Sequence, residues 1–226
     1  MKHALAIFAK TPLPGRVKTR LTPPLSPWEG AALYRCMLLD TIARSRALLV
    51  DTVIFYGGRQ FFQEAAPGAS LIHQHEGGLG TRLEKAFDAL GQMGYGARVV
   101  IGTDAPDLPL AYIEEAFRLM EAGSDAVFGP AADGGYYLVA LKGSYGKLFQ
   151  DIPWSSEQVL ETSLARARAS ALSASLLPPW YDVDSFEDLL RPGLSDSQNG
   201  APLTRGFIRD LGIGTMTAAD AVRNGR

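Results

Sequence analysis

The chain has 226 residues, of which 46% are hydrophobic and 20% are charged, with 22 Lys and Arg residues against 24 Asp and Glu residues. This length suits one sizeable core, and the formal net charge of −2 excludes the broad basic excess that nucleic acids and anionic membrane surfaces attract. No stretch approaches the roughly 20 apolar residues of a membrane span, and the start MKHALAIFAK has no small-residue cleavage site, so we expect a cytoplasmic protein.

Strand-like and helical patterns alternate along the chain. Apolar runs rich in Ile, Val, Leu and Phe lie at residues 4–9, 52–56, 98–102 and 125–129, and residues 70–76 and 135–142 are predicted to form further strands. A capping box of Ser26, Pro27 and Glu29 begins the first helix, and further helical patterns cover 79–91, 110–122 and 156–169. This alternation predicts an α/β fold with a mostly parallel sheet, in which the last run pairs antiparallel with its predecessor.

The C-terminal part has a different composition. Residues 192–204, PGLSDSQNGAPLT, carry the Pro, Gly, Ser and Asn of an irregular loop. We therefore expect a single domain over residues 1–226, in which 192–226 form a loop followed by a short helical tail.

Polar motifs follow four of the predicted strands. In an open parallel sheet, ligands bind at the carboxyl ends of the strands, where the loops after separate strands converge. The loops at 10–20, 76–82, 103–107 and 133–135 should therefore reach the same edge of the sheet.

The loop after the first strand, FAKTPLPGRVKTRL, is stiff and basic. Its prolines fix the backbone, and Gly15 can adopt angles that other residues avoid. Guanidinium and ammonium groups complement phosphate oxygens, so a phosphate chain is the expected ligand, although a solvated cationic turn is the alternative. The predicted phosphate-binding cations are Lys10, Arg16, Lys18 and Arg20.

Asp104 directly follows the buried run 98–102. Asp107 lies just ahead of the next helix and is the better candidate to cap it, which leaves Asp104 to hold a cation or to accept a structural hydrogen bond. Mg²⁺ typically binds one or two protein carboxylates together with water and substrate phosphate oxygens. A carboxylate beside a phosphate chain is repulsive unless a divalent ion lies between them, so the acidic and basic motifs together predict Mg²⁺ or Mn²⁺.

A second acidic pair occurs in YDVDSFEDLL. Asp182 and Asp184 face the same side of an extended chain, where they either join the metal site or cap the helix that follows. Ser185 and Asp188 have the spacing of a helix start.

Two glycine-rich turns complete the candidate site. Asp133, Gly134 and Gly135 form either a hairpin turn or a close backbone approach to a ligand. The turn HEGGLGTRL, with Gly78, Gly80 and Arg82, either surrounds a nucleobase or sugar or only joins a strand to a helix.

The motifs FAKTPLPGRVKTRL, GTDAPDLP, GPAADGGYYLVAL, IPWSS and DVDSFEDL, in this order, resemble the DUF2064 family of glycosyltransferase-A-like nucleotide-diphospho-sugar transferases. The likeness covers about residues 4–190. It implies a three-layer αβα Rossmann-like fold similar to that of molybdenum-cofactor guanylyltransferases and of cytidylyl- and phospholactate guanylyltransferases. Many relatives read GDLG where this chain has GGLG, so Gly78 replaces an acidic residue.

By position, the resemblance implies that Asp104 and Asp184 bind the metal, with Asp182 beside them, and that the first-loop cations face the phosphates. The leading hypothesis is a metal-dependent glycosyltransferase that uses a nucleotide-activated sugar and a small acceptor, with Lys18 and Asp104 as catalytic residues and Asp133 as acceptor base. The alternatives are a nucleotidyltransferase that uses a nucleoside triphosphate and a phosphorylated acceptor, and a nucleotide-binding module without turnover.

Overall fold

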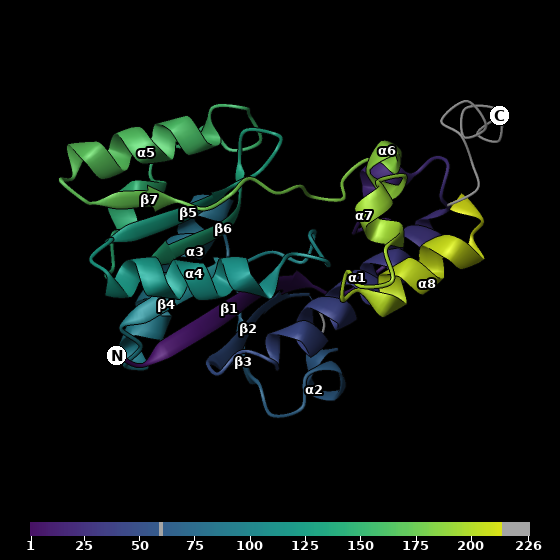
Figure 1. Ribbon diagram of the computed structural model, residues 1–226, viewed down its shortest axis with the longest axis horizontal. Coiled ribbons are helices and arrows are strands. Elements are labelled where there is room, and N and C mark those ends of the chain that lie inside the picture. Colours follow the sequence, from purple (N-terminus) through teal and green to yellow (C-terminus); the bar gives the residue numbers. More distant parts are fainter. Residues whose placement is uncertain (59–60, 214–226) are drawn as a thin grey trace.

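The computed structural model describes residues 1–58 and 61–213 (Figure 1). In this part of the chain one sheet of seven strands has the order β3-β2-β1-β4-β6-β5-β7. The strands are β1 (His3–Lys10), β2 (Asp51–Gly57), β3 (Ser70–His73), β4 (Ala97–Ile101), β5 (Ala126–Pro130), β6 (Tyr136–Leu141) and β7 (Ala174–Leu176). Strand β6 runs antiparallel to both of its neighbours and the other pairs are parallel, which confirms the predicted mixed sheet.

The predicted helices are present and short ones are added. The helices are α1 (Pro27–Ser45), α2 (Phe62–Ala65), α3 (Leu79–Gln92), α4 (Leu110–Glu121), α5 (Val159–Ala169), α6 (Phe186–Leu189), α7 (Pro192–Ser195) and α8 (Pro202–Asp210), with 3₁₀ turns η1 (Thr19–Leu21) and η2 (Gly146–Phe149). Helix α1 begins as predicted: Ser26 Oγ accepts from the Glu29 backbone N–H at 3.2 Å, and the Glu29 carboxylate accepts from the Ser26 N–H at 2.7 Å. The capping box of Ser185 and Asp188 at α6 is also confirmed.

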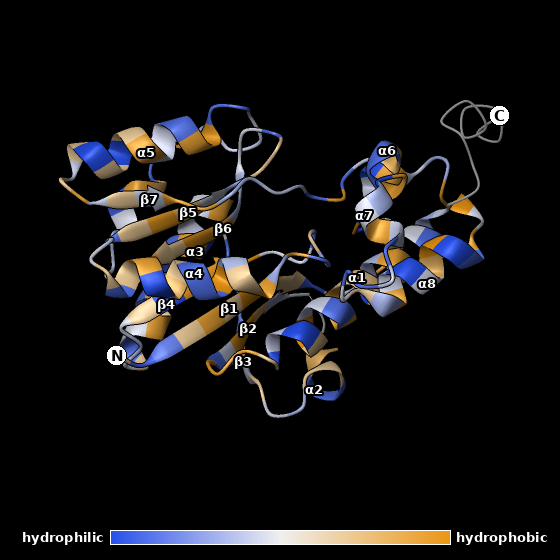
Figure 2. Ribbon diagram, viewed as in Figure 1, coloured by the Kyte–Doolittle hydropathy of each residue, from blue (hydrophilic) through white to orange (hydrophobic). Residues whose placement is uncertain are grey.

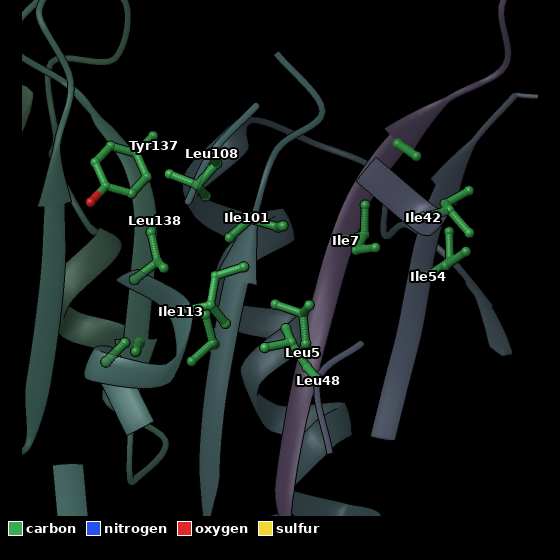
Figure 3. Close-up of a cluster of buried hydrophobic side chains, with 14 of the residues drawn as sticks. Leu5, Ile7, Ile42, Leu48, Ile54, Ile101, Leu108, Ile113, Tyr137 and Leu138 are labelled. Atoms are coloured by element: carbon green, nitrogen blue, oxygen red, sulfur yellow. The ribbon is translucent and has the colours of Figure 1, made fainter. Parts of the chain in front are cut away.

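The helices cover both faces of the sheet, which confirms the three-layer αβα fold. On one face, α1 and α4 pack on alternate residues of the central strands, and Figure 3 shows Leu5, Ile7, Ile101 and Ile113 in this cluster. On the other face, α3 and α5 pack on the intervening residues. Coloured by hydropathy, the central strands are largely apolar (Figure 2), as expected for strands buried on both faces.

Helices α6, α7 and α8 lie together beside α1, at one end of the molecule (Figure 1). A third apolar cluster joins them to η1 and α1 through Leu21, Leu33, Met37, Leu189 and Ile208. The segment expected to be a loop, 192–204, therefore starts with α7 and contains the beginning of α8. Of the expected C-terminal tail, residues 214–226 lie outside the described part.

Within the described residues, no helix is both long enough and apolar enough to cross a membrane.

Candidate active site

A cavity of about 480 Å³ opens at the carboxyl ends of β1 and β4, the edge predicted for ligand binding. Its charged lining residues come from four segments that are far apart in the chain. They are Lys10 at the end of β1 with Lys18 and Arg20 after it, Arg82 at the start of α3, Asp104 after β4, and Asp182 and Asp184 after β7. Basic and acidic motifs thus meet in one cavity, whose size falls within the range of small-molecule sites.

Lys18 lies at the centre of the charged group. Its side chain is only 4% exposed, and its ammonium forms ion pairs with Asp104 and, at 3.4 Å, with Asp184. It also donates to the Val183 carbonyl at 2.6 Å. Burial alone lowers the pKa of Lys18, but the two carboxylates outweigh it and the net pKa is raised, so the group stays charged.

Other charged groups surround this cluster. Arg20 is 3.7 Å from the second oxygen of Asp184, and its own side chain is 74% exposed. Burial, followed by the charges of Asp104, Asp184 and Asp133, raises the pKa of Asp182 to about 7. Asp182 therefore loses its proton only near neutral pH.

The carboxylates suit a divalent cation. Asp104 and Asp184 already share one cation, the Lys18 ammonium, so their oxygens can reach a common ion. Among residues 1–58 and 61–213, no group of three His, Cys, Asp or Glu side chains lies close enough to hold a metal ion. A two-carboxylate set with the remaining positions filled by water and phosphate matches the preference of Mg²⁺.

Several residues of the predicted site lie outside the cavity lining: Gly15, Arg16, Gly78, Gly80, Asp133, Gly134 and Gly135. Gly80 packs inside the protein, where an added Cβ would lie 2.5 Å from the Phe149 carbonyl oxygen. Gly134 has a φ of +85° and packs against the backbone of Glu157, while Asp133 accepts from the Gly135 N–H at 2.9 Å within the turn between β5 and β6.

The predicted capping role of Asp107 is wrong. Helix α4 begins after Pro109 without a side-chain cap, and Asp107 instead accepts a hydrogen bond from the Tyr181 hydroxyl. Pro109, which has no side-chain acceptor, occupies the N-cap position of α4. Asp107 is buried beside Tyr181 and anchors the segment that leads to Asp182.

Two residues that the sequence did not single out also line the cavity. The Tyr34 hydroxyl accepts from the Lys10 N–H at 2.9 Å and from Thr103 Oγ1 at 3.0 Å, which fixes both rim loops to α1. Gln74 lies after β3 and contacts Arg82. Each is one polar residue within an apolar or mixed stretch, so neither has a motif that could have identified it.

Comparison with known proteins agrees with the fold and the resemblance. The model of the family described as "Uncharacterized protein conserved in bacteria (DUF2064)" matches residues 41–156. The 2-phospho-L-lactate guanylyltransferase of Methanothermobacter thermautotrophicus is 32% identical over 181 residues, which cover 76% of each chain.

Solved structures give the same picture. A provisionally assigned nucleotide-diphospho-sugar transferase from Desulfovibrio desulfuricans G20 is 30% identical, with a TM-score of 0.83 over 93% of this chain and 98% of that one. A cytidylyltransferase from Leptospira borgpetersenii shares the fold at a TM-score of 0.57 and 14% identity, over 94% of this chain and 96% of that one. The relatives are transferases, as predicted for this chain, and the chain belongs to the DUF2064 family.

Proposed function

We propose that this protein is a metal-dependent nucleotidyltransferase that uses a nucleoside triphosphate and a small phosphorylated acceptor. The observation that carries the proposal is the Lys18 ammonium held between Asp104 and Asp184 in the lining of the cavity. Paired charges of both signs at the cavity surface suit a polyphosphate that arrives with a divalent ion. The similarity to a guanylyltransferase at 32% identity favours nucleotidyl transfer over the transfer of a sugar.

In this reaction an oxygen of the acceptor phosphate forms a bond to the α-phosphorus of the triphosphate. The bond from that phosphorus to the bridging oxygen breaks, and pyrophosphate leaves with the electron pair. The acceptor phosphate is already an anion, so the step needs no general base. Asp133 is absent from the cavity lining, and the proposal gives it no role.

The residues of the cavity divide this work. Asp104 and Asp184 would hold Mg²⁺ or Mn²⁺, which neutralises the phosphate charge and orients the triphosphate. Lys18, Arg20 and Lys10 line the same cavity and stabilise the negative charge that accumulates on the departing pyrophosphate. Asp182 lines the same cavity beside these groups, and its pKa of about 7 leaves the carboxyl partly protonated at neutral pH.

Sugar transfer is the second candidate. The Desulfovibrio desulfuricans protein, assigned as a nucleotide-diphospho-sugar transferase, matches nearly the whole chain at 30% identity. In that reaction a nucleoside diphosphate leaves from a sugar, and the same cations stabilise it. A binding module without turnover is the third candidate, and it would bind nucleotides and give no product.

The released product distinguishes these reactions. The protein is incubated with each nucleoside triphosphate, Mg²⁺ or Mn²⁺ and a panel of phosphorylated small acceptors, and pyrophosphate is measured. Parallel reactions with sugar nucleotides are assayed for released nucleoside diphosphate. Acceptor-dependent pyrophosphate supports the proposal, whereas release of nucleoside diphosphate alone supports sugar transfer.

The substitution Asp104→Asn tests the metal role. It removes one charge of the proposed ligand pair with little change in shape. We expect metal-dependent nucleotide binding to fall by about 100-fold, because the loss of a partner that only orients a metal ligand already costs about 10- to 100-fold. Calorimetric titration with nucleotide, with and without Mn²⁺, measures the change. Equal metal-dependent binding by the variant and the wild type would show that Asp104 holds no ion.

A further inference from the structure

We propose that Arg82, held in place by Gln74, selects the nucleobase, and that it favours guanine over adenine and cytosine. This inference rests on the proposed function, because it assigns one part of the nucleotide to one part of the cavity. It makes Arg82 a specificity-determining residue and Gln74 its positioning residue.

Gln74 has a fixed orientation. Its side chain is buried, and its amide nitrogen donates to the carbonyls of Phe55 at 2.8 Å and Ala9 at 3.2 Å, at the ends of β2 and β1. Because both partners are carbonyl oxygens, the nitrogen must be the atom that faces them. The amide oxygen then points to Arg82, whose Nη1 donates to it at 3.0 Å.

Among the described residues, several N–H donors of the Arg82 guanidinium have no protein acceptor. Gln74 accepts from one nitrogen of the guanidinium, and in the described part of the chain no carboxylate lies within ion-pair distance of Arg82. Its Nη2 has no protein acceptor there either, and its buried Nε lacks a partner. A guanidinium that lines a cavity with its charge uncompensated and its rotation blocked is ready to bind acceptor atoms of a ligand.

The place of Arg82 points to the base and away from the phosphates. Gln74 is bonded to β2 and β1, whereas Asp104 follows β4, so the two ends of the cavity are up to two strand spacings apart, roughly 10 Å. Arg82 is also on the α3 face of the sheet, while Lys18 contacts the α1 face. The apolar side chains Leu79 and Leu83, which flank Arg82 in the first turns of α3, also line the cavity, as does Phe8.

The chemistry of the free donors selects among bases. Guanine presents two adjacent acceptors, O6 and N7, to a guanidinium fork. Adenine and cytosine instead present an amino group at the equivalent edge, and donor would face donor. The preference for guanine over adenine and cytosine therefore follows from Arg82, whose orientation is fixed by Gln74 and whose charge no carboxylate among the described residues neutralises.

The test measures the ratio of GTP to ATP affinity by calorimetry in the presence of Mg²⁺, for the wild type and for Arg82→Lys, Arg82→Met and Gln74→Leu. We expect the wild type to prefer GTP, and both Arg82 variants to lose that preference by about 10- to 100-fold while ATP affinity changes little. Gln74→Leu should lower the ratio of GTP to ATP affinity by about 5- to 20-fold. Arg166→Met, on the exposed surface of α5, is the control and should keep the ratio.

The outcomes separate the two proposals. Arg82→Lys keeps the positive charge, so a phosphate contact would survive it and a base contact would not. If the Arg82 variants weaken GTP and ATP equally, or the wild type shows no preference for GTP, the base assignment is overturned and nucleotide binding stands. If the wild type binds no nucleoside triphosphate at all, both this inference and the proposed function are overturned. A general folding defect in Gln74→Leu would lower affinity for all nucleotides and leave the ratio unchanged.

Discussion

Lys18 shows how one side chain can hold a cluster of charged residues together. Its backbone adopts the left-handed conformation, with φ of 49°, which turns the side chain inward toward Asp104 and Asp184. Without the ammonium, two carboxylates would lie close together in the cavity lining with no cation between them. The same lysine that is proposed to bind phosphate therefore also keeps the acidic residues in place.

Replacing Lys18 by Met should reveal this role. We expect the free energy of unfolding to fall by about 1–3 kcal/mol, below the cost of breaking a fully buried pair, because the two carboxylates are 44% exposed. Mn²⁺ should raise the midpoint of thermal unfolding more for the variant than for the wild type, because the ion no longer competes with the ammonium. Thermal unfolding with and without Mn²⁺ measures both effects, and a variant as stable as the wild type without metal would contradict the prediction.

Gly80 has a structural reason to be glycine. An added Cβ would lie 2.5 Å from the Phe149 carbonyl oxygen and 3.0 Å from Trp154 Nε1, so Gly80→Ala must push α3 away from η2. We expect a loss of about 1–3 kcal/mol in the free energy of unfolding, measured by urea denaturation. Gly206→Ala is the matched control: it lies in α8 with no atom within 4 Å of the added Cβ, and it should be neutral or stabilising.

At the scale of elements, β7 is a short edge strand that depends on a side chain of its neighbour. It has only three residues, and Asp125 accepts from the Ser173 N–H at 2.9 Å and from the Ser173 hydroxyl at 2.8 Å just before the strand begins. The backbone hydrogen bond from Ser173, followed by its hydroxyl, lowers the pKa of Asp125. The charged form of Asp125 thus holds the start of β7 on β5.

This pairing predicts a pH dependence. Because the pKa of Asp125 is lower in the folded state, its stabilisation is present above its unfolded pKa of about 3.9 and is lost as pH falls through the folded value. Asp125→Asn should therefore cost about 1 kcal/mol at neutral pH, and the difference from the wild type should shrink below pH 4. Urea denaturation across pH measures it, with the exposed Asp210→Asn as control. A difference that does not change with pH would rule out the charged form as the cause.

At the scale of the whole molecule, the C-terminal helices pack against two segments that line the cavity of the candidate site. Leu21 of η1, directly after the basic loop, and Val183, between the two acidic residues, are buried in the same cluster as Ile208 of α8. The two loops that supply Lys18 and Asp184 therefore share one support. Loosening that cluster should change ligand binding without touching a ligand contact.

Ile208→Ala tests this connection. The side chain is 2% exposed, so its truncation should cost about 2–4 kcal/mol and also weaken nucleotide affinity, because η1 and the 182–184 segment lose a common packing partner. Leu203→Ala in the same helix is the control, since that side chain is 47% exposed and its loss should change neither quantity much. Denaturation and calorimetric titration on the same samples give both values. Normal affinity in a destabilised Ile208→Ala would show that the helices do not support the site.

The parts of the fold that the sequence predicted have strong local signals. The apolar-rich run 98–102 and the capping box at Ser26 are decided by residues a few positions apart, and they appear as β4 (Ala97–Ile101) and as the start of α1. Strand β7 gave no such signal: its sequence ASL has a polar residue at its centre, and pairing with β5 stabilises it. The local sequence around Asp107 is misleading, because it predicts a helix cap. The tertiary partner of Asp107, Tyr181, is 74 residues away, and this contact outweighs the local capping preference.

The sequence by itself determined the α/β alternation, the edge of the sheet where the loops converge, and the residue types gathered there, because these follow from hydrophobic period and from the order of motifs in the chain. Only the tertiary structure decided which of those residues share one cavity, that Lys18 pairs with Asp104 and Asp184, and that Gln74 orients Arg82. Those pairings join loops separated by up to 166 residues, as between Lys18 and Asp184. Contacts at such separation depend on the order of the strands in the whole sheet, and no local sequence pattern encodes them.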